Sequence, residues 1–456
     1  MKLTKKLFLG LSIGIGSLAM AQNTYPVLTG APFLRISPDA RAGGLGDQGV
    51  ATSADAFSQF WNASKIPFSR KISDFKIEKT NMKLTKKLFL GLSIGIGSLV
   101  MAQNTYPVLT GAPFLRISPD ARAGGLGDQG VATSADAFSQ FWNASKFPFS
   151  RNTSSAAVSY TPWMGKLTND VFLMYLGFNT MLGEEDRSSL SASIYYFNMG
   201  SVDLTRLVGT EVVNEGTAKP NEFAIDVAYA LKLSDTYSMA VTGKFIRSDL
   251  SGGIGSESTL KPANSFAVDV SGYLQTYKHT SFGDYEGRVR AGWAIQNLGP
   301  RLDYTGDENS RSYLPTTFRL GAGYDLFLDE VNKVGLTLEA SKLLVPGPDE
   351  TGNVPNVGVI EGIGKSFSNK ESIMYSGSLE YSYDNAFSVR TGYFRESEIQ
   401  GARQYATVGV GLNYNSFGLD LSYLINTSKV NTALDNTLRF GLTWNIGEES
   451  YNNEDY

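Results

Sequence analysis

The side chains that most often carry out catalysis are scarce in this sequence. It contains no cysteine and one histidine, His279, which lies between Lys278 and Thr280 in a predicted turn. Because a serine nucleophile commonly needs a histidine base beside it, a turn histidine is a poor candidate for catalysis. The acidic stretch 303–308 lacks the ligand spacing of a calcium-binding loop. We therefore predict that the protein is not an enzyme and has no catalytic residue, metal site or cofactor.

Charged side chains instead recur at alternate positions of long stretches. In residues 223–233 the odd positions are apolar, whereas the even positions are small or charged, and 318–326 and 438–446 also alternate between apolar and small or polar residues. A period of two places the apolar groups on one face of a β-strand. We expect the opposite rows to face inward, where both signs of charge favour mutual pairing over a charge-selective channel. The inward charges are Asp226, Lys232, Lys244, Asp269, Arg288, Arg290, Arg319, Asp325, Glu339, Arg390, Asp420 and Arg439.

The number and length of these stretches predict an all-β fold, a 14-stranded antiparallel transmembrane β-barrel. Strands of about ten residues suit a barrel in a membrane better than a soluble sandwich, whose strands usually have about five or six. We place them at 154–162, 170–182, 189–205, 221–233, 237–247, 265–275, 287–296, 314–327, 334–342, 372–383, 386–394, 404–414, 417–425 and 437–446.

The connections between the predicted strands alternate between tight turns and long loops. Short periplasmic turns and long outer loops are typical of outer-membrane barrels. We therefore predict a bacterial outer-membrane location, with both termini periplasmic and the long loops extracellular. Outward apolar rows would contact the lipid bilayer, and the candidates for its aromatic girdles are Tyr160, Trp163, Tyr175, Trp293, Tyr393 and Trp444. The formal charge of −4 is spread along the chain, so no basic stripe invites nucleic acid.

The start of the chain is repeated. Residues 1–70 recur at 82–151 with two substitutions, and each copy opens with a basic head and a short apolar run, as an export signal does. We interpret 1–81 as a duplicated gene start without function, made of a signal peptide at 1–21 and a partial copy of the segment at 103–151. A genuine two-unit architecture is the alternative. The working signal peptide is then 82–102, the barrel is 152–447, and 448–456 is an acidic tail.

Residues 103–151 lack strand alternation and precede the first strand. They hold two helix starts, at 118–120 and 134–136, with glycines between them. A segment of this length can fold into a barrel lumen, so we predict an N-terminal plug. The residues expected to shape it are Asp120, Arg122, Gly124, Gly125, Gly127, Asp128, Asp136, Trp142 and Asn143.

This segment also carries a family resemblance. Residues 117–132 read ISPDARAGGLGDQGVA and residues 136–143 read DAFSQFWN, which closely resemble the PorV family of the Bacteroidota type IX secretion system. The resemblance implies a barrel of the FadL type that is a partner of the protein-conducting channel. It further implies that the protein binds the C-terminal signal domain of cargo at the translocon barrel. It would then pass the cargo to the surface complex that cleaves the signal and attaches the cargo.

Two long connections are candidates for gripping a folded signal domain. They are 248–264, with Gly252, Gly253 and Gly255, and 343–371, with Pro346 and Pro348. A FadL-like transporter of small hydrophobic compounds is the alternative function, although the charged inward rows argue against the apolar cavity that it needs. An outer-membrane lipid-modifying enzyme is a third alternative, and it would have to use His279.

Overall fold

The computed structural model describes residues 108–163, 170–183, 186–208, 211–252, 260–280, 285–348, 354–368, 373–397, 401–428 and 437–449. The repeated gene start, both predicted signal peptides and residues 450–456 of the predicted acidic tail lie outside these residues. Their interpretation stays a prediction.

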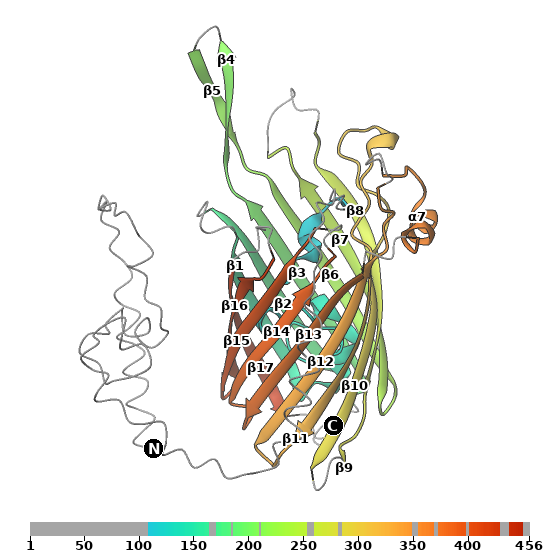
Figure 1. Cartoon of the computed structure of the whole chain (residues 1–456), viewed down its shortest axis with the longest axis vertical. Helices are drawn as coiled ribbons and strands as arrows, with labels where there is room; N and C mark the ends of the chain where they lie inside the picture. Colours follow the sequence, from blue (N-terminus) through green and yellow to red (C-terminus); the bar gives the residue numbers. More distant parts are fainter. Residues whose placement is uncertain are drawn as a thin grey trace, which may run out of the picture. The chain divides into compact units, whose positions relative to one another are not determined.

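A closed ring of 14 antiparallel strands forms the wall, which confirms the predicted fold class. The strands are β1 (Asn152–Pro162), β2 (Val171–Leu182), β3 (Ser188–Met199), β6 (Asn221–Ser234), β7 (Tyr237–Asp249), β8 (Ala263–Gln275), β10 (Glu286–Leu298), β11 (Thr317–Phe327), β12 (Asn332–Leu343), β13 (Ile373–Tyr383), β14 (Phe387–Arg395), β15 (Gln404–Tyr414), β16 (Phe417–Asn426) and β17 (Leu438–Glu449). Each strand pairs with its neighbours in chain order, and β1 pairs with β17 to close the ring (Figure 1). Closure leaves no strand edge whose amides would stay unpaired in hydrocarbon.

The alternation along each strand separates two faces of the wall. On β6, Ile225, Val227 and Tyr229 are exposed on the outside, whereas Asp226 is buried inside. Outward exposure of Tyr160, Tyr393 and Trp444 agrees with their predicted place in the girdles.

Two of the predicted girdle residues, Trp163 and Tyr175, are buried, so their prediction was wrong. Both rows of β2 are apolar, so a period of two could not tell which row faces the lumen. Trp163 lies just beyond the end of β1 and packs edge-on against Phe197.

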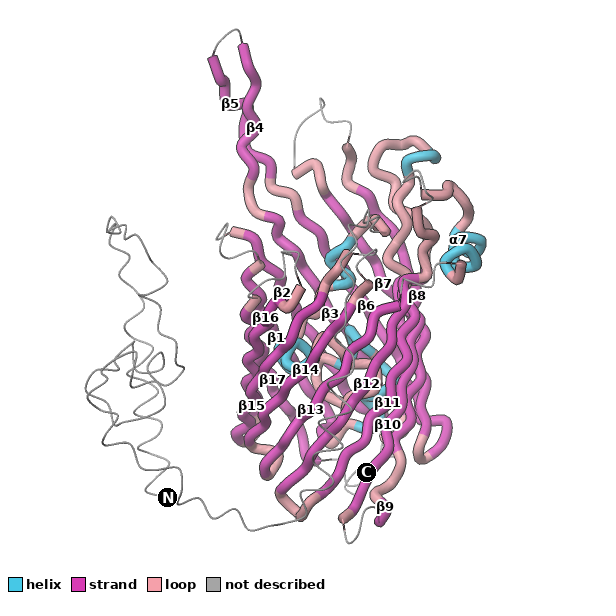
Figure 2. Tube along the Cα trace, viewed as in Figure 1, coloured by secondary structure: helices cyan, strands magenta, loops and turns pink. Residues whose placement is uncertain are grey.

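The two ends of the barrel differ in their connections (Figure 2). At one end, here called the turn end, residues 235–236, 384–386 and 415–416 make tight turns. At the other, the loop end, β4 (Val202–Val208) and β5 (Glu211–Ala218) form a hairpin, and α7 (Val359–Ser366) lies between β12 and β13. The strand predicted at 189–205 instead ends at Met199, and its last residues belong to β4. β5 and α7 lie in stretches that were predicted as loops. No helix in the described part of the chain is long and apolar enough to cross a membrane.

Residues 108–150, here called the lumenal segment, pack against the inside of the wall. They form η4 (Pro113–Arg116), α5 (Ala121–Gly125), α6 (Ser139–Trp142) and η5 (Ala144–Phe149). Val108 packs with Leu343 and Val345 at the loop end, so the first described residues lie there. Both termini lie outside the described residues, and their predicted periplasmic side stays a prediction. A segment of this length can run through the whole lumen before it enters β1 from the turn end.

Candidate functional site

The candidate site is the contact between the lumenal segment and the inward face of the wall. α5 lies against β14, β15, β16 and β17, whereas η5 lies against β3, β6, β7 and β8. These two sets of strands belong to opposite halves of the ring. The lumenal segment therefore bridges the lumen from one side to the other.

Asp120 joins the two helices of this segment. Its side chain caps α5 by accepting a hydrogen bond from the Ala123 amide, and its second oxygen accepts one from Trp142 Nε1 at 2.5 Å. The carboxylate is buried, and burial, together with the negative charge of Asp136, raises the pKa of Asp120 to about 7. This residue therefore fixes where α6 lies relative to α5.

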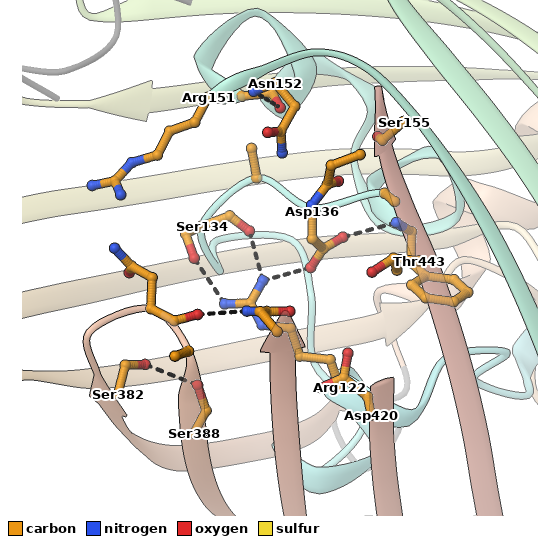
Figure 3. A pocket seen from close by; sticks show the side chains of 18 of the residues that line it. Arg122, Ser134, Asp136, Arg151, Asn152, Ser155, Ser382, Ser388, Asp420 and Thr443 are labelled. Atoms are coloured by element: carbon orange, nitrogen blue, oxygen red, sulfur yellow. Dashed lines mark hydrogen bonds and ion pairs between the residues drawn. The ribbon is translucent and has the colours of Figure 1, made fainter. Parts of the chain in front are cut away.

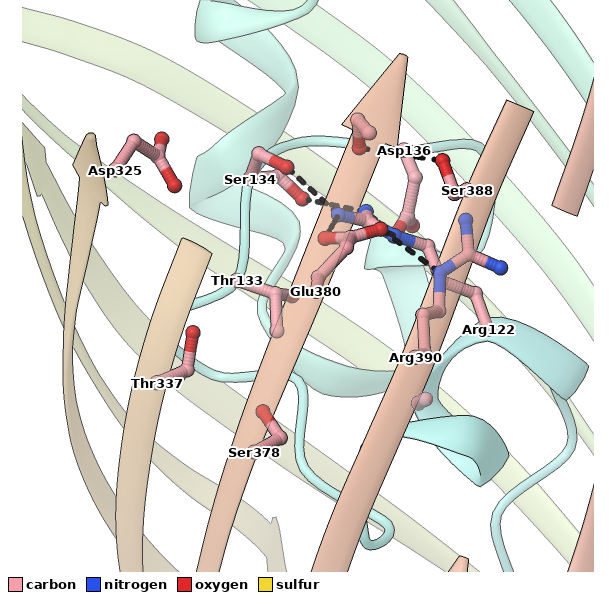
Figure 4. A network of polar contacts seen from close by, with 12 residues as sticks. Arg122, Thr133, Ser134, Asp136, Asp325, Thr337, Ser378, Glu380, Ser388 and Arg390 are labelled. Carbon is pink, nitrogen blue, oxygen red and sulfur yellow. Dashed lines mark hydrogen bonds and ion pairs between the residues drawn. The ribbon is translucent and has the colours of Figure 1, made fainter. Parts of the chain in front are cut away.

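Arg122 connects the segment to the wall (Figure 4). Its guanidinium donates to Asp136 at 2.6 Å and to Glu380 of β13 at 3.0 Å. Arg390 of β14 donates to the same Glu380 at 2.8 Å and also pairs with Asp420 of β16. Burial disfavours the charged form of Asp136, but Lys146 and Arg122 outweigh burial and lower its pKa. The five charged groups from Asp136 to Asp420 thus form one ion-paired chain.

Asp128 makes a second link between the lumenal segment and the wall. It accepts from Arg439 of β17 at 2.6 Å and from the Tyr405 hydroxyl of β15 at 2.6 Å. Its backbone has a φ of 55°, in the left-handed region that asparagine and aspartate tolerate better than most residues. The turn that follows α5 therefore presents this carboxylate to two strands of the wall.

The predicted glycines lie where the segment closely approaches the wall. An added Cβ at Gly124 would lie 2.5 Å from Ser422 Oγ, and one at Gly125 would lie 3.0 Å from Gly409 Cα. Gly127 has a φ of +73°, and its Cβ would meet the Tyr393 backbone at 3.0 Å. Side chains at these positions would force the segment away from its ion pairs.

Asn143 holds the end of the second helix. Its Nδ2 donates to the Val131 carbonyl at 2.9 Å and to the Gly272 carbonyl of β8 at 3.1 Å. Its Oδ1 accepts from the Ser145 amide at 3.1 Å and so caps η5. The residue therefore connects two parts of the lumenal segment with the wall.

The predicted inward charges on the β10, β11 and β12 side also bind the segment. Asp325 pairs with Arg288 at 2.6 Å and with Arg290 at 2.8 Å, and Arg290 in turn donates to the Ala132 carbonyl at 2.5 Å. Arg319 pairs with Glu339 at 2.9 Å. Glu339 also accepts from the amides of Gly130 and Val131, each at 3.0 Å.

The remaining predicted charges lie on β6, β7 and β8. Asp269 pairs with Lys244 at 3.0 Å, and Asp226 accepts from Gln140 of α6 at 3.2 Å. Lys232 places its ammonium 4.8 Å from the centre of the Phe149 ring of η5. All of the predicted inward charges therefore face the lumen, and several contact the segment directly.

The sequence analysis missed several residues of the network, among them Glu380, Arg116 and Glu396. Glu380 lies on the inward row of β13 among Ser376, Ser378 and Ser382, and this polar row could have revealed it. Arg116 and Glu396, which form an ion pair at 3.3 Å near the loop end, lie outside any alternating stretch. Nothing in the sequence pattern brings these two together.

A cavity of about 560 Å³ opens beneath the lumenal segment on the side of the tight turns (Figure 3). Its lining is mostly polar and includes Arg122, Asp136, Ser382, Ser388 and Asp420. Most of the charged groups named here are already ion-paired with one another. The cavity is thus a polar vestibule and not the apolar chamber that a carrier of hydrocarbons needs.

The predicted loop residues lie at the loop end. Gly252 has a φ of +62°, and its carbonyl accepts from the Lys219 amide at 2.9 Å. Pro346 packs beside Gly362 of α7, and Pro348 is half-buried nearby. Gly253 and Gly255 lie outside the described residues, so their predicted role stays untested. His279, in the short strand β9 (His279–Thr280), is exposed at the other end of the barrel.

A comparison with known protein families identifies the family of this chain. A family model described as type IX secretion system protein PorV matches residues 19–94 and 100–350. The chain belongs to the PorV family. A member of this family is an outer-membrane β-barrel component of a secretion system and not an enzyme. No curated protein sequence matches the chain.

Several solved barrels are similar to this PorV-family chain. The toluene transporter TodX of Pseudomonas putida has a TM-score of 0.44 and 10% identity, over 75% of this chain and 98% of that one. The toluene transporter TbuX of Ralstonia pickettii has a TM-score of 0.39 and 10% identity, over 72% and 96%. A FadL homologue of Pseudomonas aeruginosa has a TM-score of 0.38 and 10% identity, over 75% and 100%.

Proposed function

We propose that this barrel binds the C-terminal signal domain of secreted cargo at the type IX translocon and carries it to the surface attachment complex. Membership of the PorV family is the observation that carries the proposal. The long loops would face the outside of the cell, and the lumenal segment would be a plug. The partners are the translocon barrel, the cargo signal domain and the complex that removes the signal.

The filled lumen supports a role in binding at the surface and not in passage through the barrel. Ion pairs and backbone hydrogen bonds join the lumenal segment to both halves of the ring. Cargo or a hydrocarbon that passed through would have to break this buried network, and each broken pair costs about 3–5 kcal/mol. The described wall strands are paired over most of their lengths, with register shifts between β10 and β8, between β1 and β17 and between β6 and β7.

The long connections form one continuous surface that suits a folded ligand. The Lys219 backbone amide donates to the Gly252 carbonyl at 2.9 Å, and the Lys261 backbone amide donates to the Tyr304 carbonyl at 2.8 Å. The Tyr313 hydroxyl donates to the Val357 carbonyl at 2.7 Å. These bonds connect four successive connections, so a β-sandwich could contact several of them at once.

The test is binding of an isolated cargo signal domain to the full-length barrel in lipid nanodiscs. Replacing residues 251–262 with a short glycine-serine turn should weaken binding at least tenfold, because one part of the continuous surface is removed. The matched control replaces the connection 276–285, at the opposite end, in the same way and should bind normally. Heat-dependent gel migration verifies that each barrel is folded.

Two results would contradict the proposal. One is an intact barrel that does not bind any signal domain. The other is equal binding of the signal domain by the 251–262 and 276–285 replacements, which would mean that residues 251–262 do not contribute to binding. Affinity isolation of the intact barrel from membranes should in addition recover the translocon barrel.

A further inference from the structure

The short helix α7 has three distinct flanks. Gly362 and Ser366, one turn apart, are buried, and a Cβ at Gly362 would lie 3.2 Å from Pro346. Glu361 and Lys365 form an exposed ion pair at 2.9 Å on the second flank. The third flank is apolar and exposed, with Ile360 at 76% and Phe367, just after the helix, at 61%. The packing of α7 on the barrel therefore leaves its largest apolar side chains uncovered.

The position of Phe367 shows which way the apolar flank faces. Its ring centre lies 5.7 Å from the ammonium of Lys342, near the end of β12. Lys342 pairs with Phe318 and Ile373 across the sheet, and directly paired residues share one face. Leu336 and Leu338 lie on the same row of β12 and are exposed on the outside. The apolar flank of α7 therefore continues the outward apolar belt at the loop end.

We infer that α7 lies in the interfacial layer of the membrane leaflet at the loop end, with Ile360 and Phe367 inserted among lipid acyl chains. An amphipathic helix with one apolar and one charged flank typically binds a bilayer surface in this way. The Glu361–Lys365 flank then faces water. Lys342 is buried, and the Phe367 ring lies against its ammonium, so the aromatic side chain and not the lysine faces the lipid.

The surroundings of α7 favour lipid, and not a protein, as the cover of its apolar flank. Ile360 and Phe367 are more exposed than Leu338 in the belt itself, at 58%, so they are not covered by other described parts of the chain. An apolar patch that adjoins a lipid-facing belt is covered by the same lipid without any further partner. A protein partner at this flank would instead give protection only when that partner is present, and the experiment separates the two.

Single cysteines test the inference, because the sequence contains none. Ile360→Cys and Phe367→Cys probe the apolar flank, and Glu361→Cys and Lys365→Cys probe the charged flank. Leu338→Cys is the lipid-facing reference. Each full-length variant carries an environment-sensitive fluorophore and is reconstituted in phosphatidylcholine vesicles, with quenching measured for nitroxide-labelled lipid and for aqueous iodide.

The expected result is that labels at 360 and 367 behave like the label at 338, with several-fold more quenching by nitroxide lipid than those at 361 and 365. Iodide should give the reverse order. Equal iodide quenching on both flanks, without lipid quenching, would overturn the inference. So would protection of 360 and 367 in native outer membranes but not in pure lipid, because a protein would then cover the flank.

Discussion

The inward and outward faces of the same strands are stabilised by different interactions. On β13, Glu380 faces the lumen, where Arg122 and Arg390 both contact it, whereas Leu379 and Tyr381 on the same strand are exposed outside. An inward charge has specific partners at fixed distances, and an outward apolar group needs only an apolar surrounding. We infer that the specific pairs in the lumen define one arrangement of the barrel. The outer surface and the loops do not need such fixed partners within the chain, so they can contact other molecules.

The largest effect should come from removing Arg122. The Arg122→Met variant leaves the partly buried carboxylates of Asp136 and Glu380 without one of their cations, which should lower the free energy of unfolding by about 3 kcal/mol. Urea titration of the barrel in lipid vesicles measures the loss. The matched control is Arg311→Met, whose pairs with Asp303 and Glu308 are exposed. An exposed pair should contribute at most about 1 kcal/mol. Equal losses would remove the distinction between the two environments.

A second test concerns pH and Asp120. Burial raises the pKa of this carboxyl from 3.8 to about 7, so between these values the folded protein holds a proton that the unfolded chain releases. Stability from this group is therefore present below about pH 4 and is lost as the pH rises to about 7, by about 4 kcal/mol. The variant Asp120→Asn does not titrate, so wild type should lose stability relative to it between pH 5 and pH 8. If the unfolding midpoints of wild type and Asp120→Asn differ by the same amount at every pH in this range, Asp120 does not titrate there.

A third, smaller effect on the free energy of unfolding should come from filling the tight contact between Gly130 and Trp142 in the lumen. A Cβ at Gly130 would clash with the Trp142 ring, whose Nε1 is held by Asp120. The Gly130→Ala variant should therefore lower the free energy of unfolding by about 1–3 kcal/mol. Gly364 of α7 has no atom within 4 Å of its Cβ position, so Gly364→Ala should be neutral or slightly stabilising. Both are measured by the same urea titration, and similar losses would contradict the tight fit in the lumen.

Sequence alone predicted the wall well, because a strand is a local pattern. Each inward charge from Asp226 to Arg439 was placed on the correct face by a period of two. Where both rows are apolar, as in β2, the same rule failed and Tyr175 was put outside. The period of two therefore predicts which side chains face the lumen only when the two rows of a strand differ in polarity.

Partners in the lumen could not be predicted, because they are distant in sequence. Arg122 and Glu380 are 258 positions apart, and the link from Asp128 to Arg439 spans 311. The direction in which the lumenal segment runs, from the loop end toward β1, also depends on such contacts. The segment motif contains residues that contact the wall, but it does not indicate which strands they contact.

The smallest expected effect comes from an aromatic pair on the outer face. Phe417 and Trp444 stack at 6.0 Å and 12°, and both are exposed, so lipid can replace the contact in Phe417→Ala at a loss of about 0.5–1.5 kcal/mol. Phe394 and Tyr405 stack at a similar angle, 11°, but with their ring centres closer, at 4.8 Å, and inside the lumen. There Phe394→Ala should cost about 3–5 kcal/mol, because it leaves a cavity that lipid cannot fill. Both pairs are nearly parallel, so a larger loss for Phe394→Ala would reflect the buried, closely packed surroundings of the lumen, and equal losses would contradict an effect of the face.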